Sequence, residues 1–338
     1  MLYAKTQGWV GIDVGTNCVK LAQVARVNGQ FNIVDAAIVP RQRIWTSDIF
    51  DNDEPSSTED EIATALSIAS RCSNRRSAIC TTMKLCRFAA QSSSVGILDD
   101  AVRRQLGVGG DARHIVDHLS ASGATNETLF FAMSSKWSEQ IAIDAKRAGL
   151  RCEVIDALPL ALARALALDP TVSKHEATIG IDWGYSTVTL CVARNGRACF
   201  VRNLPRCGLR RVVDDVAVSL NLSTRDANDM LVRHGVGGHE DHRLSKLFCD
   251  VARSSIDEMA TEIEKTMRFM DSHFRSDVPN SVRVFGGGAQ IPGLTTQLGK
   301  TLGITTVAWQ FACSSQPDNL AMLGPAIALS ALAWESTR

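Results

Sequence analysis

The pattern of apolar and polar residues at the start of the chain predicts two strands joined by a tight turn. An apolar run over residues 9–12 is typical of a buried strand, and apolar side chains alternate with polar ones over residues 19–24. Between them, the stretch Asp13 to Asn17 is small and polar and contains Gly15. We therefore predict a hairpin with an aspartate at the end of its first strand and a glycine in its tip.

The same pattern returns in the second half of the chain. Residues 180–190 (GIDWGYSTVTL) repeat residues 11–21 (GIDVGTNCVKL), so that Asp182 corresponds to Asp13. Two unrelated turns would not share their flanking residues in this way. The repeat predicts two similar halves, residues 1–170 and residues 171–338.

Shorter patterns complete the prediction for the first half. The turn signal Asn28-Gly29 leads into a strand over residues 30–38, which extends the hairpin to a meander. Ser57 is predicted to cap a helix on which Ile62 begins the apolar face. An alanine-rich apolar helix over residues 156–168 ends this half.

The block 78–149 is predicted to be an α/β subdomain inserted into the first half. Its pattern indicates strands over residues 78–82, 85–89 and 128–133. It also indicates one helix that begins near Asp99 and another over residues 138–148. The block contains neither a glycine-rich phosphate loop nor a cluster of carboxylates. It is either a structural module or a surface that docks a partner.

The second half repeats the hairpin and then becomes mostly helical. The turn signal Asn195-Gly196 leads into a strand over residues 198–203, and Ser223 can cap a helix. A long helix over residues 244–274 follows, with apolar positions at near-helical spacing. A short strand then runs directly into Gly286-Gly287-Gly288.

Composition and charge narrow the range of functions. A chain of 338 residues, 45% of them hydrophobic, is long enough to form two cores. Lys and Arg total 36, as do Asp and Glu, so the formal net charge is zero. Nucleic acid is not expected as a partner, because its binding usually requires a basic excess. A small nucleotide needs only local donors and is compatible with this charge.

No stretch of the sequence has the length and hydropathy of a signal peptide or a membrane span. The apolar stretch Ala321 to Trp334 is too short and is interrupted by Gly324-Pro325. We therefore expect a cytoplasmic protein without direct membrane insertion. The ten cysteines lie in apolar segments and form no CxxC pair, which indicates reduced thiols rather than disulfides or a metal site.

Asp13 and Asp182 are the candidate residues for phosphate and metal chemistry. A carboxylate at a strand end can hold Mg²⁺ through its waters, and the N–H groups of a glycine-containing tip can cradle phosphate oxygens. An ordinary β-turn would explain one such hairpin. Its duplication favours two tips that face each other and flank one polyphosphate.

The glycine triplet is the third candidate element. Placed between a strand and the helix that Pro292 opens, Gly286-Gly287-Gly288 can let the backbone approach a nucleoside closely. On the preceding helix, Glu262 and Lys265 lie three residues apart on one face, a spacing that is typical of a solvated ion pair.

Other catalytic motifs are absent from the sequence. No GxSxG, HExxH or GxxxxGK[ST] stretch occurs, which excludes the common serine hydrolases, zinc proteases and P-loop proteins. His234, His239 and His242 are interpreted as part of a mobile polar loop rather than a metal site, because no cysteine or carboxylate set fixes their geometry.

Taken together, the two Asp-Gly hairpins and the glycine-rich third motif resemble the actin-like ATPase superfamily, which includes actin, the Hsp70 chaperones and sugar kinases. Within it, GIDVGTNCVKL, the insertion 78–149 and VIDALPLALARAL are most similar to the PilM-like proteins of type IV pilus assembly. The ending VFGGGAQIPGLTTQLGKTLGI is similar to the adenosine motif of that family. The resemblance implies an α/β, actin-like (ribonuclease H-like) duplicated two-domain fold with an inserted α/β subdomain.

The resemblance also implies ATP bound between the two halves, with Mg²⁺ held through water near Asp13 and Asp182. Phosphates would lie against both hairpin tips, adenosine against the glycine motif, and ribose and base near the preceding helix. The implied residues are Gly15, Thr16, Asn17 and Lys20 from the first hairpin, Gly184, Tyr185 and Ser186 from the second, Gly286, Gly287 and Gly288 from the glycine motif, and Glu262 and Lys265 from the helix.

A membrane-anchored partner is the second implication of the resemblance. In PilM-like proteins the insertion receives a short N-terminal cytoplasmic segment of PilN, so residues 78–149 are the expected docking region for a PilN-like protein. The protein would then lie at the inner membrane through this partner. Self-association is also compatible with the family.

Two positions depart from the family pattern and bear on hydrolysis. The second hairpin carries Trp183 and Tyr185 where relatives have small or aliphatic residues, and a phenol at this tip could crowd the terminal phosphate. Leu158 stands where relatives commonly carry an acidic residue that could position the attacking water. We therefore expect nucleotide binding with weak or absent hydrolysis.

The expected function is a nucleotide-binding scaffold of a type IV pilus or type II secretion-like machine. A small-molecule kinase of the same superfamily is the first alternative, although the insertion offers no second set of catalytic carboxylates. An FtsA-like division filament is the second. Such filaments end in a linker and an amphipathic anchor, whereas this sequence ends directly after an apolar helix.

Overall fold

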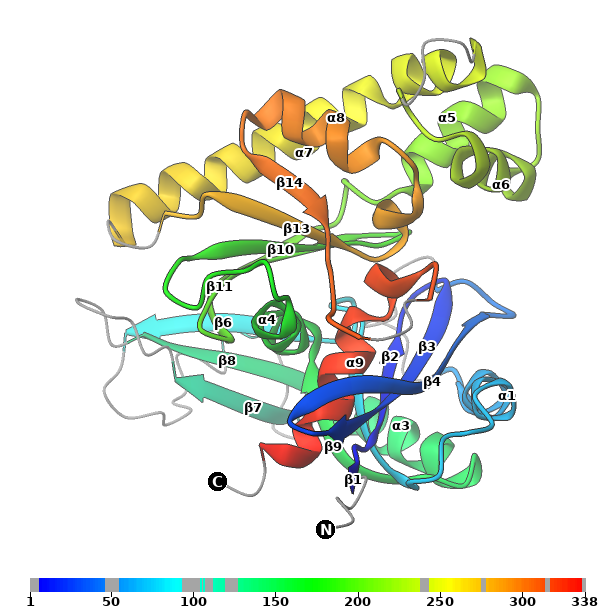
Figure 1. The fold of residues 1–338 in the computed structure, drawn as a ribbon, viewed down its shortest axis with the longest axis vertical. Helices are drawn as coiled ribbons and strands as arrows, with labels where there is room; N and C mark the ends of the chain where they lie inside the picture. Colours follow the sequence, from blue (N-terminus) through cyan, green and yellow to red (C-terminus); the bar gives the residue numbers. More distant parts are fainter. Residues whose placement is uncertain are drawn as a thin grey trace.

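In the computed structural model the chain forms two α/β halves stacked one on the other, with two helices between them (Figure 1). The structure describes residues 6–45, 55–92, 104, 106, 112–118, 127–237, 243–274, 278–313 and 317–335. The predicted helix start near Asp99 and the histidines at 239 and 242 lie outside these residues.

The first half is built on a six-stranded sheet in the order β1-β3-β2-β5-β9, with β4 paired to β3. The hairpin β2–β3 is antiparallel, whereas β5 pairs parallel to both β2 and β9. The strands are β1 (Thr6–Gln7), β2 (Val10–Val14), β3 (Cys18–Val27), β4 (Gln30–Pro40), β5 (Arg76–Thr81) and β9 (Arg151–Ala157).

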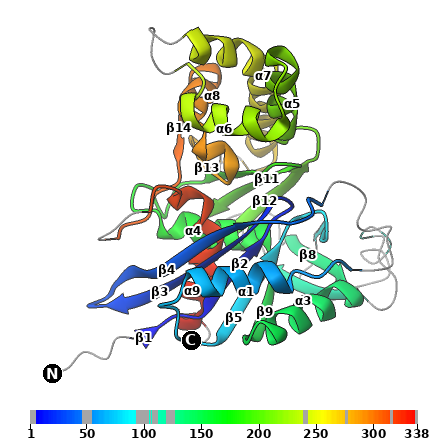
Figure 2. The same ribbon diagram turned by 90° about the vertical axis from the view of Figure 1, so that its right-hand side faces the viewer.

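Helices cover both faces of this first sheet, because its central strands are apolar on both sides. The helices α1 (Glu59–Ile68) and α3 (Ser135–Arg147) pack on one face, where Ile62 and Trp137 share a core cluster with Ile12 (Figure 2). The predicted cap of α1 differs in detail. Thr58 is the N-cap residue, and the Ser57 hydroxyl instead accepts a hydrogen bond from Glu59 N.

A separate three-stranded antiparallel sheet lies within the predicted insertion. Its order is β6 (Arg87–Ser92), β8 (Glu127–Ser134) and β7 (Ala112–His118). Residues 78–81, which we expected to open the insertion, instead belong to β5 of the first sheet. The strand β7 was not expected, because its polar and apolar residues do not alternate regularly.

The second half repeats the arrangement of the first on a five-stranded sheet, in the order β12-β11-β10-β13-β14. The hairpins match in register, since Asp13 lies opposite Lys20 and Asp182 opposite Thr189. The strands are β10 (Thr178–Trp183), β11 (Val188–Arg194), β12 (Arg197–Leu204), β13 (Ser281–Phe285) and β14 (Thr305–Ala308). The helices are α5 (Arg210–Leu220), α6 (Thr224–His234), α7 (Arg243–Phe274) and α8 (Leu294–Leu302).

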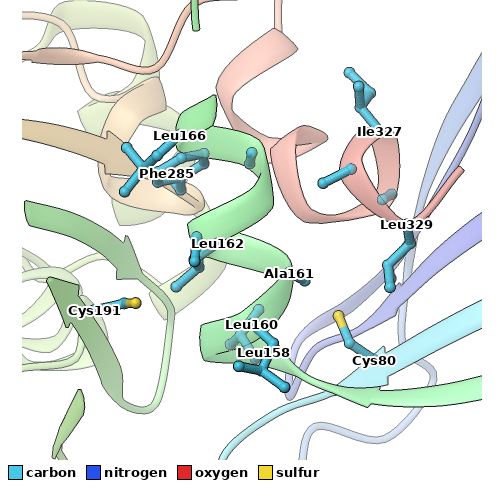
Figure 3. Packing of buried hydrophobic residues seen from close by; sticks show 14 of the residues in the cluster. Cys80, Leu158, Leu160, Ala161, Leu162, Leu166, Cys191, Phe285, Ile327 and Leu329 are labelled. Atoms are coloured by element: carbon cyan, nitrogen blue, oxygen red, sulfur yellow. The ribbon is translucent and has the colours of Figure 1, made fainter. Parts of the chain in front are cut away.

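Two apolar helices, α4 (Leu158–Leu168) and α9 (Gly324–Ala331), lie between the halves and contact each other (Figure 3). The strand β9 extends to Ala157, so α4 begins two residues later than predicted. The helix α9 lies against β2 and β3 of the first sheet, and α4 against β10, β11 and β12 of the second. The approach of α9 is so close that a Cβ atom on Gly11 would lie 1.9 Å from the Ala326 carbonyl oxygen.

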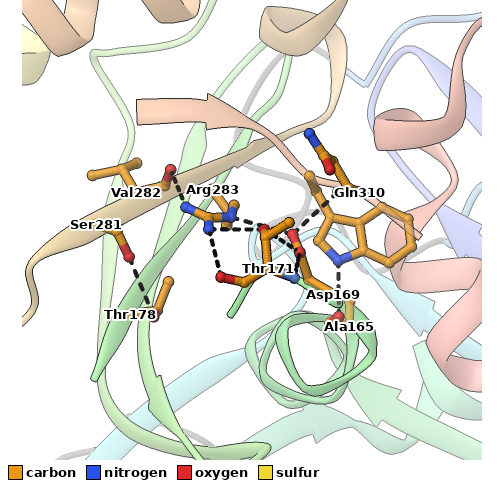
Figure 4. Close-up of polar contacts among 9 residues, drawn as sticks. Ala165, Asp169, Thr171, Thr178, Ser281, Val282, Arg283 and Gln310 are labelled. Atoms are coloured by element: carbon orange, nitrogen blue, oxygen red, sulfur yellow. Dashed lines mark hydrogen bonds and ion pairs between the residues drawn. The ribbon is translucent and has the colours of Figure 1, made fainter. Parts of the chain in front are cut away.

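A buried polar network fastens the end of α4 to the second sheet (Figure 4). Asp169 accepts hydrogen bonds from Arg283 Nε at 3.2 Å, from Thr171 N at 2.8 Å and from Gln310 N at 3.2 Å. The Trp309 indole donates to the Ala165 carbonyl at 2.8 Å. Because α4 is fixed to the second half and α9 to the first, the two helices form the contact across which the halves meet.

Two further expectations can be compared with the structure. Among the described helices, none has both the length and the apolar character to cross a membrane. All ten cysteines are free thiols, as the sequence predicts.

Candidate functional site

The two hairpin tips open onto one cleft between the halves. Eight of the residues that the sequence analysis assigned to these tips line it together, although they come from positions far apart in the chain. They are Asp13, Gly15, Thr16, Asn17, Lys20, Asp182, Gly184 and Tyr185.

At the first tip, Lys20 and Asp13 form a buried ion pair across the hairpin. Lys20 Nζ donates to Asp13 Oδ2 at 2.6 Å, and the two side chains are 7% and 2% exposed. Burial alone would lower the pKa of Lys20, but the charges of Asp13, Cys18 and Asp182 raise it above its ordinary value. The cleft therefore contains a fixed positive charge beside two carboxylates.

At the second tip, Asp182 has no such cation of its own. Its Oδ1 atom is buried and accepts no hydrogen bond from any described residue. Burial raises the pKa of Asp182 to about 6, with Lys20 acting against the shift and Asp13 adding to it. Leaving a buried acceptor without a hydrogen bond destabilises the folded protein by about 1–3 kcal/mol. A ligand that donates to this oxygen or coordinates it would remove that cost.

The glycine motif is placed beside the second tip by β13, which runs parallel to β10. A Cβ atom on Gly286, whose φ is 73°, would lie 2.2 Å from Asp182 Oδ1, and one on Gly288 would lie 2.6 Å from Trp183 Cβ. Only glycine permits these approaches. Gly287, in the short helix η1 (Gly287–Gln290), lines the cleft.

The remaining predicted residues lie elsewhere. Glu262 and Lys265 on α7 are not among the residues that line the cleft; Glu262 instead pairs with Arg202 of β12 at 2.5 Å and with Lys265 at 2.6 Å. The face of α7 that carries Glu262 is turned toward β12, which is why the pair does not reach the cleft. Ser186 also does not line it, and its carbonyl lies against Gly208 instead.

Several lining residues were missed by the sequence analysis. On α6 and around η1, amide and apolar side chains form the side of the cleft away from the first hairpin, and no local motif identifies them. They are Asn228, Val232, Gln290 and Ile291, accompanied by Leu209 and Met322. Leu158, which the family comparison singled out, does line the cleft, from the first position of α4.

A second hollow, here called the groove, lies between the inserted sheet and the first sheet. Its lining combines Phe131 and Met133 of β8, Ser138 and Ala142 of α3, and residues 153–157 of β9. The strand β9 is the last strand of the first sheet and pairs with β5 alone, so its other edge is unpaired within the described sheet. An apolar groove beside a free strand edge is suited to an extended peptide.

We expect Asp182→Asn to stabilise the ligand-free protein at pH 7.5. The pKa of Asp182 is about 6 in the folded protein and about 4 in an unfolded chain. Folding therefore prefers the neutral form, and stability falls as the pH rises from about 4 to about 6. Asparagine mimics the neutral form, so the gain should be on the order of 2 kcal/mol at pH 7.5 and should shrink as the pH falls toward 4. Urea unfolding at several pH values measures it.

The matched control for this prediction is Asp250→Asn. Asp250 is 56% exposed and forms only a surface pair with Arg253, so its replacement should change stability by less than about 0.5 kcal/mol. A destabilised Asp182→Asn variant at pH 7.5 would contradict the assignment of Asp182 as an uncompensated carboxylate.

Two duplicated α/β halves around a shared cleft, each beginning with an Asp-Gly hairpin, define the actin-like fold. Solved structures of the same architecture include MreB5 of Spiroplasma citri bound to ADP, with a TM-score of 0.52, 14% identity and coverage of 98% of this chain and 97% of that chain. The ethanolamine utilization protein EutJ from Carboxydothermus hydrogenoformans has a TM-score of 0.57 at 15% identity, over 97% and 90% of the two chains.

The similarity is greater to a chain of the PilM–PilN type IV pilus biogenesis complex. Its TM-score is 0.74 at 19% identity, over 98% of this chain and 99% of that chain. No protein-family model and no curated protein sequence matches this chain. The predicted fold class is therefore confirmed, and the likeness to this chain of the PilM–PilN complex extends over the whole fold.

Proposed function

We propose that this protein is a nucleotide-binding scaffold that docks a membrane-anchored PilN-like partner in a type IV pilus or type II secretion-like machine. The observation that carries the proposal is the convergence of both hairpin tips on one cleft that holds a buried lysine and an unpaired carboxylate oxygen. The likeness to a chain of the PilM–PilN complex supports the choice of partner.

In the proposed complex, ATP lies with its phosphates between the two tips. Lys20 supplies the positive charge for phosphate oxygens. The backbone N–H group of Gly184 supplies a donor, whereas that of Gly15 already donates to the Cys18 carbonyl at 3.0 Å. Asp182, with its unpaired Oδ1, fits an Mg²⁺ ion held through water, because magnesium takes one or two carboxylates and completes its shell with phosphates and waters. Asp13 would be the second such carboxylate. MreB5 with bound ADP supports this type of ligand.

The nucleoside would lie at the other side of the cleft, against Gly287. Asn228 of α6 and the nearby Gln290 offer amide groups that can both donate to and accept from the edge of a base. Val232 and Ile291 supply apolar surface for its face. Glu262 and Lys265, which were expected near ribose and base, are not required in this arrangement, because both already form ion pairs on α7.

The partner would bind in the groove between the insertion and the first sheet. Apolar side chains such as Phe131 and Met133 can receive anchor residues of an extended peptide, and the free edge of β9 can pair with its backbone. Binding of this kind would hold the protein at the inner membrane through its partner.

Weak or absent hydrolysis is part of the proposal. Leu158 occupies the cleft from the start of α4, and an apolar side chain there cannot orient an attacking water. Steady-state ATPase activity of the unmodified protein should therefore stay near background, and Leu158→Glu provides the comparison. Rapid turnover by the unmodified protein would contradict this part of the proposal.

Calorimetric titration of the full chain tests the two binding sites. Mg-ATP should bind saturably and, at about 100 times its Kd, should stabilise the fold by about 2.7 kcal/mol. A synthetic peptide of the N-terminal cytoplasmic segment of the PilN-like protein from the same genome should also bind. Ala142→Glu, inside the groove, should weaken the peptide about tenfold or more, whereas Ile143→Glu, on the exposed side of α3, should not. Failure of either ligand to bind overturns that part of the proposal.

A further inference from the structure

We infer that two short segments, one in each half, position the backbone N–H groups of the hairpin tips for binding phosphate. They are residues 41–45, which follow β4, and residues 208–210, which lead into α5. The inference rests on the proposed binding of a nucleotide in the cleft and adds the residues that hold the tips in place.

In the first half, the segment after β4 holds two carbonyl groups of the tip. Arg41 N donates a hydrogen bond to the Asn17 carbonyl at 2.9 Å, and Trp45 N donates one to the Thr16 carbonyl at 3.0 Å. Arg41 and Trp45 are buried, at 7% and 4% exposed, so water has little access to these bonds. The backbone of this tip is therefore fixed from the side of residues 41–45.

In the second half, residues at the start of α5 hold the tip in the same way. Leu209 N donates to the Gly184 carbonyl at 3.0 Å, and Arg210 N donates to the Tyr185 carbonyl at 2.8 Å. The first N–H groups of a helix have no partner within the helix, and here the tip satisfies two of them. Tyr185 corresponds to Thr16 in the internal repeat, so an equivalent carbonyl is held in both halves.

These hydrogen bonds fix the direction of the neighbouring N–H groups, because the C=O and the N–H of one trans peptide unit point in opposite directions. The Thr16 and Asn17 carbonyls point toward residues 41–45, so the N–H groups of the next residues, Asn17 and Cys18, point away from that segment. Asn17 and Cys18 line the cleft, and residues 41–45 are not among the described residues that line it. Successive N–H groups turned to one hollow form a site for an anion.

In the second half, the close approach depends on glycine at position 208. A Cβ atom on Gly208 would lie 2.5 Å from the Ser186 carbonyl carbon and 2.6 Å from the Tyr185 carbonyl oxygen. Carbon atoms in ordinary contact are about 3.5–4.0 Å apart, so alanine would push the start of α5 away from the tip. The bonds from Leu209 and Arg210 would lengthen, and the direction of the Tyr185 N–H would no longer be fixed.

Gly208→Ala tests the segment in the second half. We expect its Kd for Mg-ATP to rise about tenfold or more, the effect of losing one hydrogen bond to a charged group. The Kd for adenosine, which has no phosphate, should stay within about twofold of that of the unmodified protein. Calorimetry measures Mg-ATP directly and adenosine by competition with it.

The matched control for Gly208→Ala is Gly8→Ala. A Cβ atom on Gly8 would lie 2.5 Å from the Ser330 carbonyl oxygen, an equally tight contact with backbone, but against α9 rather than a tip. Gly8→Ala should lose a comparable amount of stability in urea unfolding and keep the Kd values of both ligands.

Arg41→Pro tests the segment in the first half, with Arg41→Ala as its matched control. Both variants lose the guanidinium, but only proline also lacks the N–H that donates to the Asn17 carbonyl. The preceding residue, Pro40, lies in the strand β4, a conformation that suits a residue before proline. Arg41→Pro should bind Mg-ATP about tenfold or more weakly than Arg41→Ala, whereas the two should bind adenosine equally.

The possible outcomes separate the inference from the proposed function. If the unmodified protein does not bind Mg-ATP, the proposed function is wrong. If it binds Mg-ATP and Gly208→Ala keeps the Kd values of Gly8→Ala, or weakens adenosine as much as Mg-ATP, the inference is overturned. Equal Mg-ATP binding by the two Arg41 variants overturns it for the first half, and this pair decides alone if Gly208→Ala does not fold.

Discussion

Replacement of Lys20 by methionine should destabilise the protein by about 3–5 kcal/mol at pH 7.5 and abolish the thermal shift produced by Mg-ATP. The Nζ atom of Lys20 lies 2.6 Å from Asp13 Oδ2, and both side chains are buried. Without this cation, the carboxylates of Asp13 and Asp182 are left in one cleft with no compensating charge. Urea unfolding measures the first effect, and thermal unfolding with and without Mg-ATP measures the second.

A second variant separates charge from packing. The double variant Asp13→Asn, Lys20→Met replaces one of the two carboxylates with a neutral amide. It should therefore regain part of the stability that Lys20→Met loses. Lys265→Met is the matched control, because Lys265 is 54% exposed and its pair with Glu262 should be worth less than about 1 kcal/mol. A Lys20→Met variant within about 1 kcal/mol of the unmodified protein would contradict the role given to the pair.

Arg283→Met should destabilise the protein to a similar extent, about 3–5 kcal/mol, at a distance from the cleft. The side chains of Arg283 and Asp169 are 5% and 0% exposed, and Arg283 Nη2 also donates to the Thr171 hydroxyl at 3.0 Å. The methionine leaves Asp169 as a buried anion that retains only neutral donors. Urea unfolding gives the size of the loss.

The control for Arg283 is Arg253→Met, which removes an exposed pair with Asp250. Arg253 is 65% exposed, so the change should cost less than about 1 kcal/mol. Since the Asp169 network fixes α4 to the second sheet, Arg283→Met should also loosen the contact between the halves. Equal stability of the Arg283→Met and Arg253→Met variants would show that the network does not have this structural role.

Most of the fold could be predicted because its organising signal is local and repeated. The strand periodicity and the Asp-Gly tip occur twice, and both copies form hairpins of equal register. The strand β9 was not predicted, and the helix after it was expected to begin at Asp156, which instead lies near the end of the strand. The four-residue strand β14 is too short to give a periodic signal.

The residues of the cleft also divide into those that the sequence predicts and those that only the structure shows. Residues of the tips were predictable because the chemistry of a phosphate loop is contained in a few consecutive positions. Asn228 and Gln290 were not, because their place in the cleft depends on how α6 and η1 pack within the second half. For Glu262, the spacing to Lys265 correctly predicted an ion pair, but only tertiary structure decides that this face of α7 meets Arg202.

The position of α9 has a consequence for the order in which the chain can fold. The Ser330 hydroxyl donates to the Trp9 carbonyl at 2.6 Å and accepts from Val24 N at 2.9 Å, so one of the last helices of the chain closes the core around its first strands. During synthesis, one face of the first sheet therefore stays uncovered until almost the whole chain has left the ribosome. At rates of roughly 5–20 residues per second, this interval lasts on the order of tens of seconds, during which the apolar face that α9 later covers is exposed to solvent.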